Sequence, residues 1–174
     1  KLLQQLDGPA HWVSSVSFSP NGTVLAAGGR DEKLHIWLID SSYKATLVSQ
    51  LEGHDGEVKS VCWAPDNRRI ATTSTDCSVR LWEFQNYVGQ NLSIYDESEH
   101  SFLYCAWNSD GTRLLVSSSG GEISLLGAEK ENEDEEEESA ICLLRHFVMK
   151  AKSDDGSKDE ALCVAISPGD CDIA

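Results

Sequence analysis

Short segments in which apolar and polar residues alternate recur along this chain with a period of about 44 residues. Four aromatic or aliphatic anchors mark the copies, at Phe18, Trp63, Trp107 and Ile166, and they follow one another at steps of 45, 44 and 59 residues. Alternation with a period of two is typical of a β-strand that buries one face. Repeats of this length, built from short strands, are typical of stacked or radially arranged β-units, none of which buries its faces alone.

Each repeat divides into four short strands separated by turn residues. In the second repeat Pro65, Asp66 and Asn67 form the first turn, because proline presets φ and both Asp and Asn tolerate the next turn positions. The same division predicts strands over residues 13–18, 23–28, 33–39 and 45–51 in repeat one, 58–63, 69–73, 78–84 and 90–95 in repeat two, and 102–107, 113–118, 122–126 and 140–147 in repeat three. The pattern therefore indicates an all-β chain.

The repeats also define the expected organisation of the chain. We expect residues 1–6 to be the outer strand of a preceding unit, residues 151–174 to be a linker and the start of a fourth unit, and the three full units to span 7–51, 52–96 and 97–150. Because the chain begins with Lys and its last repeat stops within a strand, we interpret it as a piece of a longer protein.

Acidic residues dominate the charge of the chain, whose formal net charge is −15. The run EKENEDEEEE at 129–138 carries −7 of that charge, and we expect this insert in repeat three to be disordered because like charges repel and stay solvated. The rest of the chain is acidic as well. This balance disfavours nucleic acids and anionic membranes as partners, and it favours proteins with basic segments.

The six cysteines form no CxxC pair, which argues against a zinc ribbon or a redox motif. Cys62, Cys105 and Cys163 fall within apolar strand segments, where free thiols act as small hydrophobes. This usage favours a reducing intracellular compartment, the cytoplasm or the nucleus. No run of 18 apolar residues is present, so the sequence predicts no transmembrane helix.

In repeat two, the stretch from Leu51 to Glu83 has Gly53-His54 near its start, Asp76 in a turn, and Trp82-Glu83 at its end. Repeat one has Asp31 and Trp37 at the same six-residue spacing. These residues resemble the WD-repeat (WD40-type) family, which has Trp-Asp where repeat two has Trp82-Glu83. The resemblance extends over essentially the whole chain. It implies a β-propeller of four-stranded antiparallel blades, with three nearly complete blades and part of a fourth in this incomplete propeller.

The resemblance also implies a buried hydrogen-bond network in each blade, formed by His, Ser or Thr, Asp and Trp. Repeat two supplies all four as His54, Ser74, Asp76 and Trp82. An Asp in a tight turn orients a neutral His, which bridges through the hydroxyl to the indole N–H. We interpret this set as structural and not catalytic.

The other repeats depart from this pattern. In repeat one Pro9 takes the His position and Gly29 the hydroxyl position, although Asp31 and Trp37 remain. In repeat three Ser98, Gly120 and Leu126 take the His, Asp and Trp positions. His11 and His100 lie two residues after the family position, so each either restores the network through a shifted loop or lies on the surface. We therefore expect repeat three to be the loosest blade.

Partners of this family typically bind the face where each blade's first strand begins and its second strand turns. By position, this top face comprises Ala10, Trp12, Arg30, Asp55, Glu57, Thr75, Glu99, Ser101 and Ser119. Trp12 and Arg30 come from one blade and are of the types enriched at binding hot spots. An equally weighted alternative is that Trp12 packs on a neighbouring loop.

We find no Gly-rich phosphate loop, HExxH or Gly-x-Ser-x-Gly motif, so the sequence predicts neither an enzyme nor a cofactor or metal site. The preferred interpretation is a non-catalytic protein-interaction scaffold in a multi-subunit intracellular assembly. Two alternatives stay open. One is a receptor for a short basic or modified peptide, such as a histone tail, on the acidic top face. The other is a scaffold of cytosolic iron–sulfur protein assembly, which the stretch at 52–65 resembles over one blade.

Overall fold

Three four-stranded antiparallel sheets make up the fold in a computed structural model that describes residues 2, 4–128 and 141–148. In each sheet the strands pair in the order of the sequence, as a meander. Blade one contains β1 (Val13–Phe18), β2 (Val24–Gly29), β3 (Leu34–Ile39) and β4 (Ala45–Leu51). Blade two contains β5 (Val58–Trp63), β6 (Arg69–Ser74), β7 (Val79–Gln85) and β8 (Val88–Tyr95). Blade three contains β9 (Phe102–Trp107), β10 (Arg113–Ser118), β11 (Glu122–Gly127) and β12 (Cys142–Val148).

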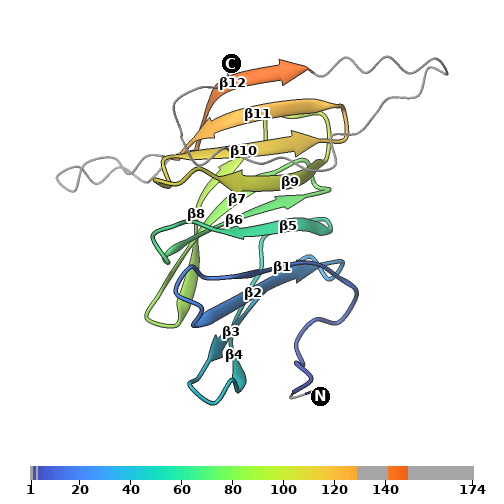
Figure 1. Cartoon of the computed structure of the whole chain (residues 1–174). Helices are drawn as coiled ribbons and strands as arrows, with labels where there is room; N and C mark the ends of the chain where they lie inside the picture. Colours follow the sequence, from blue (N-terminus) through green and yellow to red (C-terminus); the bar gives the residue numbers. More distant parts are fainter. Residues whose placement is uncertain (1, 3, 129–140, 149–174) are drawn as a thin grey trace.

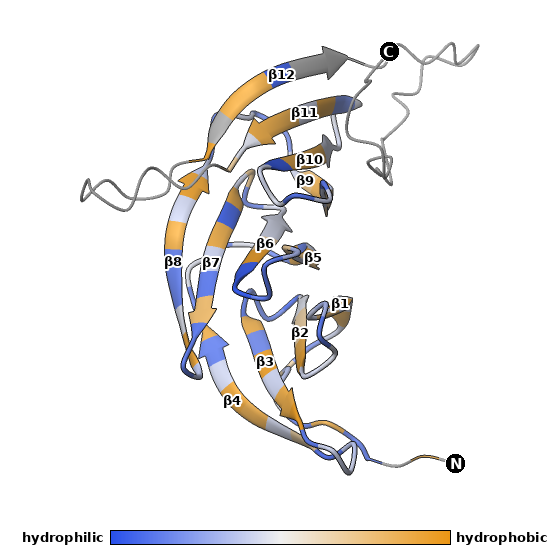
Figure 2. Ribbon diagram, turned by 60° about the vertical axis from the view of Figure 1, so that its left-hand side comes forward, coloured by the Kyte–Doolittle hydropathy of each residue, from blue (hydrophilic) through white to orange (hydrophobic). Residues whose placement is uncertain are grey.

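The blades follow one another from bottom to top in Figure 1, and Figure 2 shows that they lie along an arc. The first strands β1, β5 and β9 lie next to one another on the inner side, and Figure 2 shows the outer strands β4, β8 and β12 along the opposite, convex side. This is the arrangement of propeller blades. The predicted fold class is confirmed, as a partial propeller. The predicted fourth unit and the acidic insert at 129–138 lie outside the described residues.

Irregularities in strand pairing recur at equivalent places in the three blades. The pairing of the first two strands shifts between Val13 and Ser15 in blade one and between Val58 and Ser60 in blade two. The pairing of the third and fourth strands shifts next to Trp37, next to Trp82 and next to Leu126. Bulges increase local twist, so their repetition gives each blade a similar shape.

The core lies between successive blades, because the first strand of one blade packs on the sheet before it. Val58, Val61 and Trp63 of β5 are buried with Val24 and Ile36 of blade one. The fit is close, since a Cβ added at Gly28 would come within 2.4 Å of a Val58 methyl carbon. A side chain at this position would therefore push the two blades apart.

The corresponding side chains of β1 have no such cover among the described residues. Val13, Val16 and Phe18 occupy the same repeat positions as Val58, Val61 and Trp63, but they are 47%, 63% and 58% exposed. An inner strand of this kind is apolar in order to pack on a preceding sheet. The open face of blade one is therefore the one that carries Val13, Val16 and Phe18 of β1.

Residues 1–6, predicted as an outer strand, are not assigned to a strand at Leu2 or Gln4–Leu6. The side chain of Gln4 instead makes two 2.9 Å hydrogen bonds to the backbone N–H and C=O of Ala45 on the edge of β4, and Leu6 packs near Trp37. The physical reason is that an extended segment needs a partner strand for its backbone groups. Here the side-chain amide of Gln4, and not a strand, pairs with the backbone N–H and C=O of Ala45 at the edge of β4.

Candidate functional site

The turn between β6 and β7 and the loop before β5 build a buried polar network in blade two. His54 Nδ1 lies 2.7 Å from Asp76 Oδ2, and His54 Nε2 lies 2.7 Å from Thr72 Oγ1. The indole N–H of Trp82 donates to the same hydroxyl at 2.8 Å. Gly53 makes room for this stack, because a Cβ there would come within 3.1 Å of the Trp82 ring.

Asp76 is the charged end of this network. Burial by itself raises the pKa of Asp76, but the hydrogen bonds from His54 and Ser78 outweigh it and hold the pKa well below its usual value. With Asp76 ionised, the donors and acceptors match when His54 carries its proton on Nδ1 and Thr72 donates to Nε2. Each buried polar group of the network then has a partner, which favours a single rigid arrangement of the loop.

The bridging hydroxyl belongs to Thr72 and not to Ser74, which the family pattern had predicted for this role. Ser74 Oγ instead accepts a 3.1 Å hydrogen bond from the backbone N–H of Asp76. Side-chain direction does not distinguish the two residues, because Thr72 and Ser74 are two apart in β6 and face the same side of the sheet. The difference is position along the strand, since Thr72 is the residue whose hydroxyl lies within reach of both the Trp82 indole and His54. The sequence contains a hint of this role. Repeats one and three have the apolar residues Ala27 and Val116 at the position where repeat two, the repeat with the complete network, has the hydroxyl of Thr72.

Blade one closes a shorter version of this network with a histidine from β3 in place of one from the loop before the first strand. His35 of β3 lies 2.8 Å from Asp31 Oδ2 through its Nε2, and the backbone N–H of Ala10 donates to the same oxygen at 2.9 Å. Burial alone raises the pKa of Asp31, but these two contacts hold it below its usual value. The His35 ring stacks on Trp37, whose indole N–H donates to the backbone carbonyl of Asp7. His11 is exposed, and sequence reasoning did not identify His35.

Blade three has apolar contacts where blade two has its network. Leu126 takes the place of Trp82 and Val116 the place of Thr72, and both are fully buried. His100 lies over Gly120, where a Cβ would come within 2.7 Å of the imidazole ring, and its Nδ1 is 3.6 Å from Glu122 Oε2. His100 therefore takes a position near the edge of the blade, paired with a carboxylate from β11.

On the predicted top face, Trp12 and Arg30 form a pair. The Arg30 guanidinium lies 5.6 Å from the centre of the Trp12 ring, and the Arg30 backbone N–H donates to the Trp12 carbonyl at 2.9 Å. Trp12 is 77% exposed, so its ring does not pack into a neighbouring loop. An exposed indole with a cation over its face presents a large, preorganised contact surface.

Glu57 links this pair to blade two. Its carboxylate accepts a short hydrogen bond from the Ser14 hydroxyl and lies 3.4 Å from Lys59 Nζ. The hydrogen bond from Ser14 is the first cause of a lowered pKa for Glu57, and the charges of Lys59 and Arg30 add to it. Ser14 and Arg30 belong to blade one, so this contact crosses the boundary between two blades.

The same face continues into blade three through backbone contacts. The Thr75 backbone N–H donates to the Glu57 carbonyl at 3.0 Å, and the Ser101 hydroxyl donates to the Thr75 carbonyl at 3.1 Å. Ser119 donates its backbone N–H to the Ser101 carbonyl at 2.9 Å. Trp12, Arg30, Glu57, Thr75 and Ser101 therefore lie along one strip, in which the Ser14–Glu57 hydrogen bond connects blade one to blade two; we call it the top-face strip.

Two of the predicted residues lie beside this strip. Asp55 is exposed, and its backbone N–H donates to Asp76 at 3.1 Å. Glu99 lines a separate hollow of about 390 Å³ on blade three, together with Glu97, Glu122 and Tyr95. Burial raises the pKa of Tyr95, and the charges of Glu97 and Glu122 raise it further. We call this the acidic hollow.

Within the described ranges, no group of three or more His, Cys, Asp or Glu side chains is placed to hold a metal ion. The same part of the chain contains no helix that is long and apolar enough to cross a membrane.

Comparison with known proteins agrees with this architecture. Residues 1–37 and 45–83 match the family described as "WD domain, G-beta repeat" (WD40). Together with the blades and the His54–Asp76–Trp82 network, this match identifies the chain as a WD40-repeat protein.

Its relatives are diverse. The chain is 39% identical over 100 residues to probable cytosolic iron-sulfur protein assembly protein 1 of Vanderwaltozyma polyspora, which is 48% of this chain and 29% of that protein. It is 30% identical over 130 residues to THO complex subunit 3 of Arabidopsis thaliana, covering 73% of this chain and 40% of that protein. It is 29% identical over 131 residues to the WD repeat-containing protein 26 homolog of the same plant, covering 74% and 22%. The chain thus spans less than half the length of each of these relatives.

Proposed function

We propose that this chain is a non-catalytic interaction scaffold, a WD-repeat part of a larger intracellular assembly. The observation that carries the proposal is the top-face strip, in which the exposed Trp12–Arg30 pair of blade one lies beside a chain of hydrogen bonds that runs from Ser14 through Glu57 and Thr75 to Ser101 across three blades. A surface held by its own hydrogen bonds loses little entropy when a partner binds. The name of one relative, THO complex subunit 3, supports the same class of role, because it describes a member of a complex.

Quantitative affinity purification from cells that express tagged variants tests this proposal. The Trp12→Ala and Arg30→Glu variants should lose a defined set of co-purifying proteins by about tenfold or more, as expected for hot-spot residues. Tyr43→Ala is the matched control, because Tyr43 is equally exposed, at 76%, in the turn between β3 and β4 and outside the strip. Identical partner sets for the wild type and for both top-face variants would contradict the proposal.

A second candidate function, a receptor for a short basic peptide, is favoured by the acidic hollow. Three carboxylates, those of Glu97, Glu99 and Glu122, line it, and the chain carries a formal net charge of −15. Lys and Arg side chains complement such a field. An array of short peptides tests this function. A receptor selects basic sequences and loses them when Glu97 and Glu99 are replaced by Gln, whereas a scaffold for folded partners selects none.

A third candidate, a part in cytosolic iron–sulfur protein assembly, is favoured by the 39% identity to the relative of that name. The identity covers 48% of this chain, so it concerns about two blades. Depletion of the protein should lower the incorporation of radioactive iron into cytosolic iron–sulfur proteins in the same cells. Unchanged incorporation would remove this candidate and leave the general scaffold function intact.

A further inference from the structure

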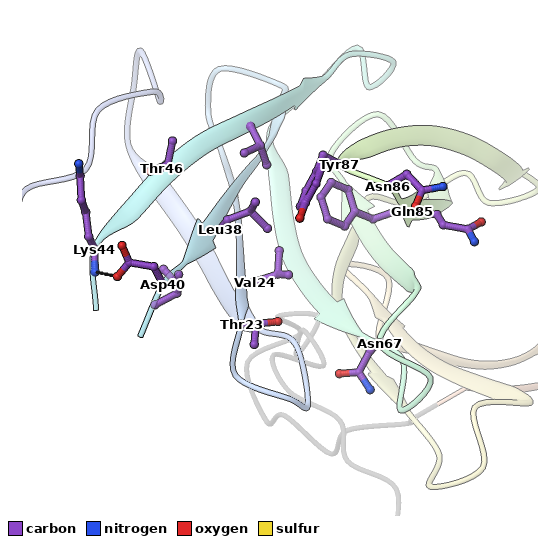
Figure 3. A pocket seen from close by; sticks show the side chains of 13 residues that line it. Thr23, Val24, Leu38, Asp40, Lys44, Thr46, Asn67, Gln85, Asn86 and Tyr87 are labelled. Atoms are coloured by element: carbon purple, nitrogen blue, oxygen red, sulfur yellow. Dashed lines mark hydrogen bonds between the residues drawn. The ribbon is translucent and has the colours of Figure 1, made fainter. Parts of the chain in front are cut away.

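Two boundaries separate the three blades, and they differ in the side chains that meet there. Between blades one and two a groove of about 760 Å³ opens away from the top-face strip, with Val24, Leu38 and Tyr87 among its lining residues (Figure 3). None of the described residues that line this groove is a cysteine. Between blades two and three, by contrast, the inner strands β5 and β9 bring two cysteines together. The second boundary therefore carries redox-active groups.

Cys62 of β5 and Cys105 of β9 face each other across this boundary. Their Sγ atoms lie 2.9 Å apart, although the two residues are separated by 43 positions in the sequence. Both side chains pack into or against the apolar cluster that joins blades two and three. A small shift of the two side chains is enough to bring the sulfurs to bonding distance.

Hydrogen bonds hold the backbone of each cysteine against the other blade. The Cys105 backbone N–H donates to the Ser60 hydroxyl at 3.4 Å, and the Trp107 indole N–H donates to the Cys62 carbonyl at 3.3 Å. The Cys105 thiol itself lies 3.6 Å from the Ser60 hydroxyl. Because these contacts cross the boundary next to both thiols, the fold itself keeps the two sulfurs together.

The boundary between blades one and two has the same geometry without the thiols. There the backbone N–H of Val61 donates to the Ser15 hydroxyl at 3.0 Å, as that of Cys105 donates to a serine of the blade before it. Val61 occupies the repeat position of Cys105, and Ser17 occupies that of Cys62. The repeat therefore brings these two positions together, and within the described ranges both are cysteines only at the second boundary.

The two thiols differ in exposure. Cys105 is 2% exposed, whereas Cys62 is only partly buried, so a small oxidant reaches Cys62 first. Burial, and then the neighbouring Cys105, raise the pKa of the Cys62 thiol well above its usual value. The thiolate is the reactive form of a cysteine. The pair therefore stays reduced at neutral pH unless an oxidant persists.

We propose that Cys62 and Cys105 are a redox-sensitive pair, which hydrogen peroxide converts into a disulfide that locks blade two to blade three. Cys62 Sγ attacks one peroxide oxygen, the O–O bond breaks, and the departing hydroxide takes the thiol proton to become water. Cys105 Sγ then attacks the sulfur of the resulting sulfenic acid, the S–O bond breaks, and the hydroxyl group leaves with the Cys105 proton as a second water. The two sulfurs lose two electrons and peroxide gains them. A dithiol reductant reverses the bond by thiol–disulfide exchange.

The disulfide would lie between two contacts that already join these blades. At the top-face end the Ser101 hydroxyl donates to the Thr75 carbonyl, and at the opposite end of β9 Arg69 donates to the Gly111 and Ala128 carbonyls. A covalent bond midway along the strand prevents the boundary from opening while both ends keep their contacts. It also restricts the unfolded chain by closing a loop of 43 residues.

Peptide mapping of the native protein after exposure to hydrogen peroxide tests the proposal. Trypsin cleaves after Lys and Arg, so Cys62 and Cys105 fall in separate peptides, 60–68 and 81–113, with one cysteine each. After free thiols are blocked with iodoacetamide, we expect a disulfide to join these two peptides and dithiothreitol to release them. Recovery of both peptides unlinked, or a link that forms only in protein unfolded by urea, would overturn the proposal.

Thermal unfolding shows whether the bond locks the blades. Peroxide should raise the melting temperature of the wild type by about 5–10 °C, and dithiothreitol should reverse the rise. Cys62→Ser should show neither the linked peptides nor the rise. Cys77→Ser is the matched control, because Cys77 is also partly buried but lies in the turn between β6 and β7, and it should behave as the wild type.

Two outcomes of these measurements would contradict the lock. One is the same rise in Cys62→Ser, which would assign it to other cysteines, and the other is a linked pair of peptides without any rise. The pair is independent of the top-face proposal, since Trp12→Ala should form the same disulfide. A failure of either proposal is therefore seen separately.

Discussion

Blade two and blade three have the same strand order, yet different interactions hold their upper ends together. In blade two His54, Asp76, Thr72 and Trp82 form a closed polar network. In blade three the hydroxyl and indole positions are held by Val116 and Leu126, and the Asp position by Gly120. Apolar packing keeps the strands together. It fixes the conformation of the loop above them less tightly than a network in which every polar group has a hydrogen-bond partner.

Blade three depends in part on a side chain of its neighbour. Arg69 of β6 is buried and donates to the Ala128 and Gly111 carbonyls of blade three at 2.7 and 2.8 Å. Its guanidinium also lies 5.1 Å from the centre of the Trp107 ring and is paired with Asp66. The comparison teaches that repeats with weak internal networks are stabilised across the blade boundary, as expected for a chain whose units contact only their neighbours.

The largest expected effect follows from removing that cross-blade contact. Arg69→Ala should lower the free energy of unfolding by about 3–5 kcal/mol, because it leaves two carbonyls and the Asp66 carboxylate without their partner. Chemical denaturation measures this loss. Arg68→Ala is the matched control, since Arg68 is 42% exposed and its pair with Glu83 should contribute less than about 1 kcal/mol. Similar losses for the two variants would contradict the cross-blade role.

The next largest effect compares the histidine of blade two with that of blade three. His54→Ala should cost about 1–3 kcal/mol, since Asp76 and Thr72 lose their shared partner, whereas His100→Ala should cost less than about 1 kcal/mol. Thermal unfolding of both variants measures the difference. Equal shifts in melting temperature would show that the network of blade two carries no more stability than the edge contact of blade three.

A smaller effect distinguishes the two hydroxyls of β6. Thr72→Val keeps the shape but removes the bridge between His54 and Trp82, and it should cost about 1–2 kcal/mol. Ser74→Ala removes one hydrogen bond from the Asp76 backbone N–H and should cost about half as much. A larger loss in Ser74→Ala, measured by denaturant unfolding, would return the bridging role to Ser74.

The contribution of Asp76 to the blade-two network depends on pH. The folded-state pKa of Asp76 lies below its ordinary value of 3.8, so its contribution to stability is present at neutral pH and is lost as the pH falls through and below 3.8. Asp76→Asn removes that contribution, so the stability difference from the wild type should shrink between about pH 5 and pH 2.5. If the difference in the free energy of unfolding between the wild type and Asp76→Asn stayed constant over this range, the ionisation of Asp76 would not contribute to stability.

The strands could be predicted well from the sequence, because alternation of apolar residues around Phe18, Trp63 and Trp107 sets which face of each strand is buried. The order of the strands in each sheet follows from the repeat in the same way. The N-terminal segment was harder, since a strand at residues 1–6 requires a partner that the pattern of this chain does not supply. The bulges beside Trp37 and Trp82 were not predicted, because alternation alone does not reveal an extra residue in a pairing.

The polar site was predicted in part. His54, Asp76 and Trp82 follow from the family spacing, but the choice of Thr72 over Ser74 depends on which hydroxyl lies level with the indole. His35 was missed because it reaches Asp31 from β3 and not from the loop that usually provides the histidine.

Native-state hydrogen exchange tests most directly the claim that blade two is held by its own network and blade three by its neighbour. We predict that the amides of β6 and β7 exchange more slowly, with a higher free energy of opening, than those of β10 and β11. We also predict that Arg69→Ala speeds exchange in β10 and β11 far more than His100→Ala does. Equal protection of the two blades, with no selective response of β10 and β11 to Arg69→Ala, would contradict it.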